Sequence, residues 1–95
     1  MQFLVDVRIR DSAQAAPHLA DHLAYLNAHF DSGDFLMFGA YAGGEGGALI
    51  ARAPSRGALD DLLAADPLQA GHCAEWIVTE FKTGRLNAAA FETAH

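Results

Sequence analysis

The hydrophobic pattern of the chain changes period several times, and the order of these changes limits the folds that it can adopt. Residues 2–10 alternate between apolar and polar side chains, which is typical of a strand with one buried face. A helical pattern follows from about Ala13 or Pro17 to Asp31, and Gly33 is placed to end it. The first third of the sequence therefore predicts a strand followed by an amphipathic helix.

The remaining two thirds predict two more strands, a helix and a last strand. Residues 35–41 and 48–53 have strand patterns that a glycine-rich hairpin joins. A second helix is predicted from its N-cap Ser55 to the residue before Pro67, because proline disfavours a helical conformation in the preceding residue. A fourth strand is predicted over residues 72–82. The order βαββαβ indicates an α+β, ferredoxin-like fold, in which two helices cover one face of a four-stranded antiparallel sheet.

The first predicted helix carries two neighbouring stripes of side chains. We expect an apolar stripe to pack on the sheet as core, and it consists of Leu19, Leu23, Leu26 and Phe30. The polar rings beside it fall within about 60° of arc, and they are His18, His22, Tyr25 and His29. We expect these rings at the edge of the core, where the wall of a cleft would lie.

The second predicted strand is apolar on both faces. Strict alternation puts Phe35, Met37 and Tyr41 on one face and Leu36, Phe38 and Ala40 on the other. A sheet with helices on one side needs only one such face. The second apolar face therefore predicts a partner subunit, and we expect a homodimer.

Composition argues against several kinds of partner and location. Twelve acidic residues outnumber six basic ones, and the net charge of -6 argues against a surface that binds nucleic acid. The single cysteine, Cys73, cannot form an intramolecular disulfide, and its place in an apolar strand is typical of an inert core thiol. We see no signal peptide and no apolar run long enough to span a membrane, so we expect a cytoplasmic protein.

His22 and Asp66 are the most informative pair of polar residues. In the βαββαβ topology the first helix begins at the end of the sheet where the second helix finishes, so both residues are expected there. A carboxylate beside an imidazole fixes its tautomer, and the second ring nitrogen can then exchange a proton, as general acid–base catalysis requires. The alternative is structural, with His22 as a half-buried polar residue and Asp66 as a turn residue before proline.

Two other arrangements of polar residues compete for a chemical role. His18 and His22 are one helical turn apart, a spacing that can hold a metal, but no cysteine pair or HExxH motif accompanies them, and we predict no metal site. Arg8 and Arg52 are expected on neighbouring strands, where they could hold an anionic substrate. Pairing of Arg8 with Asp6 is the simpler interpretation.

Several short motifs resemble those of one known family. They are His22-Leu23-Ala24-Tyr25-Leu26, Gly33 with Phe35-Leu36, Gly39-Ala40, and Asp66-Pro67-Leu68-Gln69-Ala70-Gly71 ahead of a strand that ends in Glu80-Phe81. They make residues 1–82 similar to the YciI-like (YCII-related) domain family and leave residues 83–95 as a C-terminal tail. The sequence departs from the family pattern at Leu19, Ala40 and Leu68, where arginine, proline and an aromatic residue are common.

The resemblance implies a small homodimer of the dimeric α/β-barrel type, and it implies no cofactor. It also implies that His22 and Asp66 form a catalytic pair for proton transfer, isomerisation or dehydrohalogenation of a small aromatic or enol-type molecule. We predict that the pocket residues are Tyr25, Phe38, Gly39 and Trp76. A non-catalytic module that binds a small ligand in the same cleft is the alternative.

Overall fold

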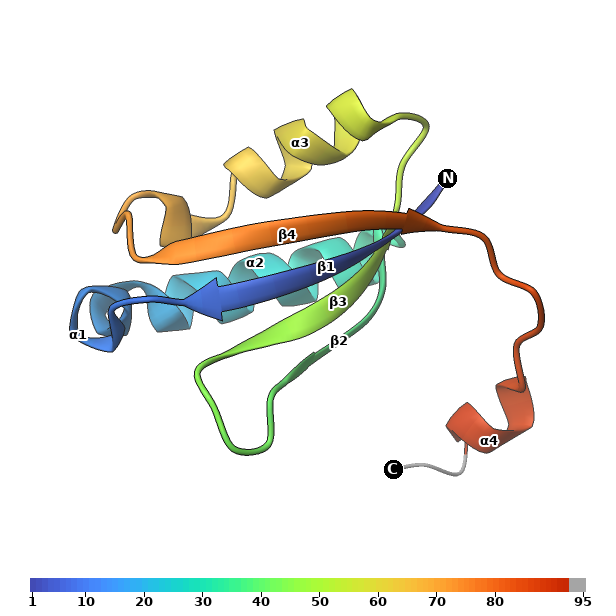
Figure 1. Cartoon of the computed structure of the whole chain (residues 1–95), viewed down its shortest axis with the longest axis horizontal. Coiled ribbons are helices and arrows are strands. Elements are labelled where there is room, and N and C mark those ends of the chain that lie inside the picture. The colour runs from blue at the N-terminus through green and yellow to red at the C-terminus, as the bar shows by residue number, and fades with distance from the viewer. Residues whose placement is uncertain (93–95) are drawn as a thin grey trace.

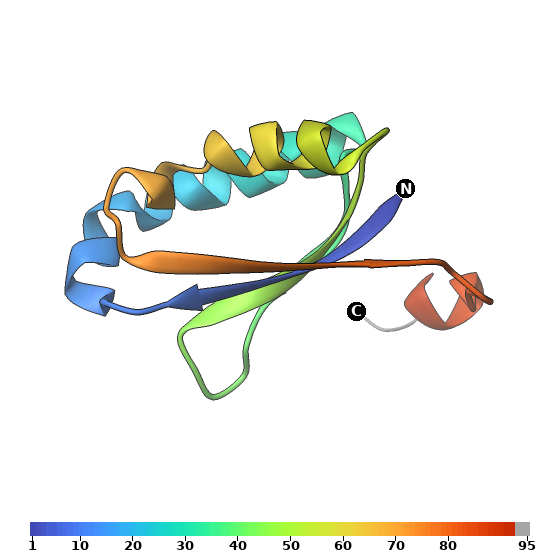
Figure 2. The same cartoon turned by 45° about the horizontal axis from the view of Figure 1, so that its top comes forward.

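The computed structural model describes residues 1–92 and has two layers (Figures 1 and 2). A four-stranded sheet forms one layer, and two main helices lie along one of its faces. In chain order the elements are β1 (Gln2–Ile9), α1 (Ser12–Ala15), the 3₁₀ turn η1 (Ala16–His18), α2 (Leu19–Ser32), β2 (Phe35–Ala40), β3 (Gly46–Arg52), α3 (Arg56–Ala64), the 3₁₀ turn η2 (Pro67–Gln69), β4 (Ala74–Phe81) and α4 (Ala88–Glu92).

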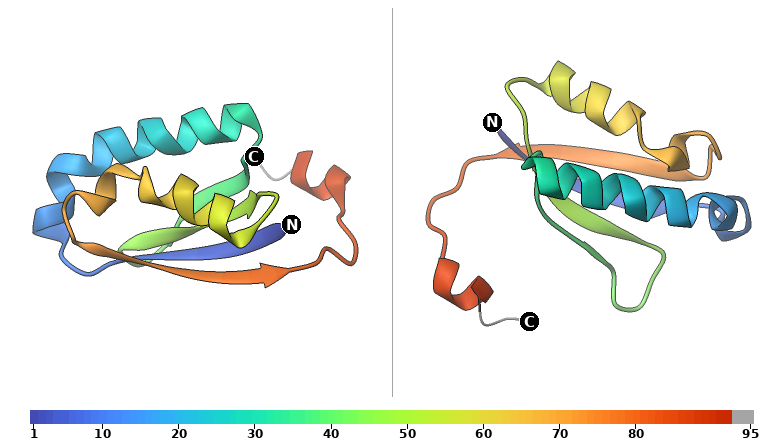
Figure 3. Two further views of the ribbon diagram at one scale, coloured as in Figure 1. Left: turned by 90° about the horizontal axis from the view of Figure 1, so that it is seen from above. Right: turned by 180° about the vertical axis from the view of Figure 1, so that it is seen from behind.

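The sheet has the strand order β2-β3-β1-β4, and all neighbouring strands are antiparallel. The predicted ferredoxin-like βαββαβ fold is therefore confirmed. β1 lies inside the sheet, where Val5 pairs with Leu49 on one side and with Val78 on the other. The two helices run so that the start of α2 and the end of α3 lie at the same end of the sheet (Figure 3).

Short local signals fix the helix ends. The side chain of Asp11 accepts a hydrogen bond from the backbone N–H of Gln14 at the start of α1. Ser55 caps α3 in the same way by accepting from the N–H of Ala58, as its position before the helical pattern predicts. Gly33 follows α2 with a φ angle of 87°, a left-handed conformation that favours glycine. Capping thus explains the predicted start of α3 and the predicted end of α2, whereas α3 ends at Ala64, two residues before the end predicted from Pro67.

The core lies between the sheet and the helices. β1 alternates as predicted, with Phe3, Val5 and Val7 buried under the helices. The thiol of Cys73 is also fully buried. Among the residues whose burial the structure describes, the buried apolar ones are Phe3, Val5, Val7, Ala15, Phe35, Leu49, Ala51, Ala53, Leu59, Leu63, Leu68 and Cys73.

The prediction that the apolar stripe of α2 is core is wrong for three of its four members. Leu19, Leu23 and Phe30 are 44%, 53% and 49% exposed, and only Leu26 is half-buried. The neighbouring polar rings turn inward instead, and they are His22, Tyr25 and His29. The polar rings can be buried because each has a hydrogen-bond partner there, so little free energy is lost on leaving water.

The strict alternation predicted for β2 is also wrong. Phe35 pairs with Ala51, but Met37 pairs with Ile50, so one extra residue, Leu36, lies between the two pairs. This bulge keeps Phe35 on the helix side, where it is fully buried, and puts Met37 on the opposite face. Sequence alternation cannot reveal such an insertion, because a bulge changes which face each following side chain occupies.

The face of the sheet without helices carries an apolar patch. Leu4, Met37, Ile77 and Phe81 are between 37% and 42% exposed, and Ile50 lies half-buried among them. We call these five residues the outer patch. Monomeric proteins rarely leave such a contiguous patch in water.

The chain beyond β4 extends away from the two layers, and α4 lies apart from them (Figure 1). The described part of the predicted tail therefore contains a short helix, while residues 93–95 lie outside the described residues. In the part of the chain that the structure describes, no helix is both long and apolar enough to cross a membrane.

Candidate functional site

His22 and Asp66 meet at the end of the sheet where the topology puts them. The distance from His22 Nδ1 to Asp66 Oδ1 is 2.7 Å. The side chain of Asp66 is only 2% exposed and that of His22 is 16% exposed. Because a carboxylate only accepts hydrogen bonds, the Nδ1–H of His22 donates to Asp66. The Nε2 atom then remains as the ring nitrogen that a ligand can use.

The backbone around Asp66 holds its carboxylate in place. Pro67 prevents Asp66 from continuing α3, and Asp66 is extended with φ −63° and ψ 127°. Its Oδ1 also accepts the backbone N–H of Leu68 at 2.9 Å, which caps η2. A buried carboxylate with these two donors has a fixed position, so it can orient the imidazole of His22.

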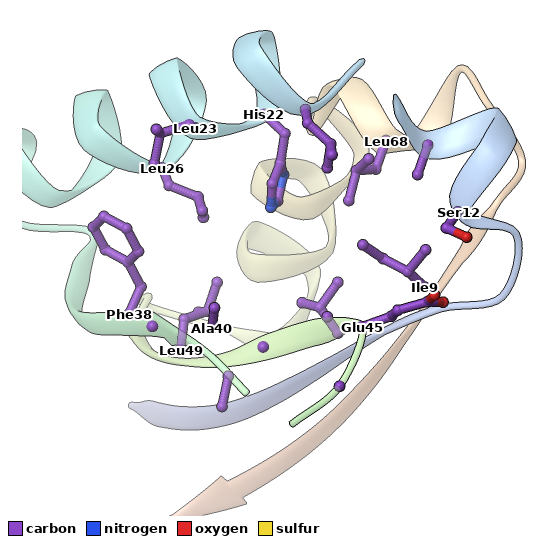
Figure 4. Close-up of a pocket in the computed structure, with 18 residues that line it drawn as sticks. Ile9, Ser12, His22, Leu23, Leu26, Phe38, Ala40, Glu45, Leu49 and Leu68 are labelled. Atoms are coloured by element: carbon purple, nitrogen blue, oxygen red, sulfur yellow. The ribbon is translucent and has the colours of Figure 1, made fainter. Parts of the chain in front are cut away.

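The ring of His22 points into a cavity of about 440 Å³ between α2 and the β2–β3 hairpin (Figure 4). The lining is largely apolar and includes Leu23, Leu26 and Phe38. Three polar side chains also line it: Ser12, His22 and Glu45. Ligand pockets commonly have such an apolar wall with a few polar groups. The exposed apolar stripe of α2 therefore forms the wall of this cavity.

The structure divides the four predicted pocket residues into two pairs. Phe38 and Gly39 line the cavity with His22. Tyr25 and Trp76 do not line it, and both pack against the core. The indole N–H of Trp76 is buried without a hydrogen-bond partner in the described chain. Two of the four residues predicted to line the pocket beside His22 therefore do so.

Tyr25 connects the two helices. Its hydroxyl donates to the backbone carbonyl of Leu62 in α3 at 2.6 Å. Its ring lies edge-on to Phe35, with the centroids 5.7 Å apart. Burial raises the pKa of the Tyr25 hydroxyl, and the nearby carboxylates of Asp66 and Asp34 raise it further. The hydroxyl therefore stays protonated and has a structural contact.

A second histidine–aspartate pair lies at the other end of α2. His29 Nδ1 is 2.9 Å from Asp34 Oδ2, and the hydroxyl of Ser32 donates to the same oxygen at 2.9 Å. These two hydrogen bonds, with that from His29 the stronger influence, lower the pKa of Asp34. This pair does not line the cavity. It is therefore a natural control for the chemistry of His22 and Asp66.

The metal site and the anion site considered from the sequence are not formed by the residues that the structure describes. Within residues 1–92, no group of three or more histidine, cysteine, aspartate or glutamate side chains could hold a metal ion. The guanidinium Nε of Arg8 donates to Asp6 at 2.9 Å, and that of Arg52 donates to the carbonyl of Gly33 at 3.0 Å. Neither arginine lines the cavity. Pairing of Arg8 with Asp6 was the simpler of the two sequence interpretations.

Sequence reasoning missed two polar residues of the cavity, Ser12 and Glu45, of which only Glu45 carries a charge. Glu45 lies in the turn between β2 and β3, and Figure 4 shows it near Ile9 and Ser12, at the end of the cavity away from Phe38. Its place in the glycine-rich hairpin was visible in the sequence. No periodic pattern extends through a turn, so only the folded chain relates Glu45 to His22.

Comparison with known proteins supports the fold. The profile of the YCII-related domain family matches residues 1–82. The 5-chloro-2-hydroxyhydroquinone dehydrochlorinase of Burkholderia phenoliruptrix, solved with 2,5-dihydroxybenzoquinone, is 24% identical, and the match covers 88% of this chain and 96% of that chain with a TM-score of 0.75. Muconolactone isomerase is 23% identical, and the match covers 85% and 88% of the two chains with a TM-score of 0.72. The search of curated proteins found no match.

Proposed function

Because the chain belongs to the YCII-related domain family, we propose that it is a small enzyme that moves a proton on an aromatic or enol-type molecule in the cavity. The observation that carries the proposal is the 2.7 Å bond from His22 to the buried Asp66, with the ring facing the cavity. His22 is the general base and acid in this proposal, and Asp66 is its positioning partner.

The proton follows a simple path. Nε2 of His22 takes a proton from a carbon or hydroxyl of the ligand, and the carboxylate of Asp66 stabilises the imidazolium through Nδ1–H. Return of the proton to another ligand atom completes an isomerisation. In a dehydrohalogenation, the electron pair of the broken C–H or O–H bond forms a new double bond, the halide leaves with the electrons of the carbon–halogen bond, and His22 then releases its proton to water. Apolar walls around Phe38 and Leu26 exclude water from the reacting atoms.

The outer patch supports a homodimer as part of this proposal. Its apolar residues would be buried if two sheets packed face to face as in a dimeric α/β barrel. The cavity lies on the helix side of the sheet, so both protomers would keep their own His22 and Asp66. We also expect the dimer to be cytoplasmic. Its net charge of -6 argues against binding of nucleic acid.

The test compares the two histidines of α2. Chloride release from 5-chloro-2-hydroxyhydroquinone is measured without oxygen for the wild type, His22→Ala and His29→Ala. We expect His22→Ala to lower turnover by about 10²-fold or more, the usual contribution of a general acid–base group. His29→Ala removes an equivalent bond to an aspartate outside the cavity and is expected to keep turnover. Equal losses in both variants would contradict the proposal, and binding of this compound without turnover would favour the non-catalytic module.

A further inference from the structure

Among the described residues, the side chains that line the cavity include a carboxylate but no lysine or arginine. The carboxylate is that of Glu45, which lines the cavity together with His22. The nearby basic residues have acidic partners of their own, since Arg8 pairs with Asp6 and Arg10 pairs with Glu75. An anionic ligand would therefore meet the negative charge of Glu45 in the cavity, and the ring that could carry a positive charge there, His22, is already paired with Asp66.

Glu45 is exposed, and the two glycines that follow it bring the hairpin close to the neighbouring strands. Gly46 has a φ angle of 105°, and a Cβ atom there would lie 2.0 Å from the carbonyl oxygen of Val7. A Cβ atom on Gly47 would lie 2.2 Å from the carbonyl oxygen of Gly39. Both contacts are far too short for a side chain, so only glycine lets the hairpin approach β1 and β2 this closely. The close approach keeps Glu45 at the cavity.

The polar groups of the cavity are arranged along its length. Phe38 lies at one end in Figure 4, His22 lies near the middle, and Ser12 and Glu45 lie at the other end. A flat ring in the middle of the cavity can therefore lie beside His22 while a hydroxyl on its Glu45 side points toward that carboxylate. An ionised carboxylate only accepts hydrogen bonds, so the group that it recognises must be a donor.

We propose that Glu45 makes the cavity selective for uncharged hydroxylated rings and excludes carboxylates. Glu45 accepts a hydrogen bond from a ligand hydroxyl, which places the ring against His22, and it repels a ligand that carries a carboxylate at the same end. The inference rests on the proposed function because it uses the same cavity. Beyond the proposed function, it states that the substrate is uncharged and that Glu45 is the residue that selects for this.

The test uses two probes that differ by one carboxylate. Hydroquinone is uncharged at pH 7, whereas 2,5-dihydroxybenzoate carries one negative charge, because phenols titrate near pH 10 and carboxyl groups near pH 4. Dissociation constants are measured by protein NMR, without turnover, and shifts of the His22 ring signals report binding in the cavity. We expect the wild type to bind hydroquinone about 10-fold or more tightly than 2,5-dihydroxybenzoate, since like charges a few ångströms apart repel strongly at the protein surface.

Variants of Glu45 separate charge from shape. Glu45→Gln keeps the size of the side chain and should bring the two dissociation constants to within about 3-fold, and Glu45→Lys should reverse the preference. Asp31→Asn makes the same change of net charge at an exposed position near the end of α2 and should keep the wild-type preference. An equal or stronger affinity of the wild type for 2,5-dihydroxybenzoate would overturn the inference. So would no binding of hydroquinone at millimolar concentration, or an unchanged preference in Glu45→Gln.

This experiment is independent of catalysis. If His22→Ala keeps turnover, the proposed function fails, but the preference of the cavity for hydroquinone can still be measured. If the preference is absent while His22→Ala abolishes turnover, the proposed function holds and the role of Glu45 is overturned.

Discussion

The carboxylate of Asp66 lies 2.7 Å from the imidazole of His22, although 44 positions of sequence separate the two residues. The bond joins the early turns of α2 to the exit of α3. The same oxygen of Asp66 also accepts the backbone N–H of Leu68, so Asp66 can stabilise the fold as well as orient His22. Two substitutions of Asp66 distinguish its contribution to stability from its contribution to catalysis.

Asp66→Asn keeps an acceptor for both donors but removes the negative charge. We expect the free energy of unfolding to change by about 1 kcal/mol or less, because the hydrogen bonds can persist. The kcat of the reaction that His22 performs should fall by about 10-fold or more with little change in KM, since an amide stabilises an imidazolium poorly. Urea denaturation and steady-state kinetics measure the two effects, and a wild-type kcat would show that Asp66 has no chemical role. Asp66→Ala should show the same loss of kcat, and its free energy of unfolding should also fall by about 1–3 kcal/mol because buried donors are left without an acceptor.

The outer patch predicts the oligomeric state. Light scattering should report about twice the chain mass of 10.1 kDa. Leu4→Glu places a charge in the patch, and burial of an unpaired charge costs several kcal/mol, so the variant should be monomeric. The matched control is Ala64→Glu, at an exposed position of α3, which should leave the mass unchanged. A wild-type monomer at micromolar concentration would refute the sheet-to-sheet dimer.

The hairpin glycines are expected to differ in their tolerance of a methyl group. Gly46→Ala should destabilise the protein by about 1–3 kcal/mol, because a side chain is strained at a φ angle of 105° and its Cβ would clash with Val7. Gly44→Ala should change stability by less than about 0.5 kcal/mol, since nothing lies within 4 Å of its added carbon. Chemical denaturation compares the two variants, and equal stabilities would mean that the hairpin does not need the close approach.

Tyr25 predicts a loss of stability at alkaline pH. The tyrosine of the unfolded chain loses its proton near pH 10, whereas burial, Asp66 and Asp34 raise the pKa of Tyr25 in the folded chain. The unfolded state therefore binds fewer protons above pH 10, and the stabilisation present below pH 10 is lost as the pH rises through the folded-state pKa. Tyr25→Phe should be about 1 kcal/mol less stable at pH 7 because it loses the bond to Leu62. Between pH 10 and pH 11 the free energy of unfolding of Tyr25→Phe should fall less than that of the wild type. Urea denaturation of both proteins at the two pH values measures this difference.

The order of the elements and the helix caps could be predicted from local rules, and the meeting of His22 with Asp66 from the topology that this order implies. Periodicity defines which residues share a face, Ser55 and Gly33 mark helix ends, and the βαββαβ connection brings the start of one helix to the end of the other. These features need no knowledge of what a face contacts. The sequence by itself therefore determined the fold and the end of the sheet at which the polar pair lies.

Only the tertiary structure decided what each face meets. The stripe with Leu23 lines a cavity and the stripe with Tyr25 is buried, because the polar rings found hydrogen-bond partners inside. One extra residue at Leu36 changed the faces of β2, and the close approach of Gly46 to β1 brought Glu45 beside the cavity. Each outcome depends on contacts between segments far apart in the chain, whose geometry is set by packing and not by the period of the sequence.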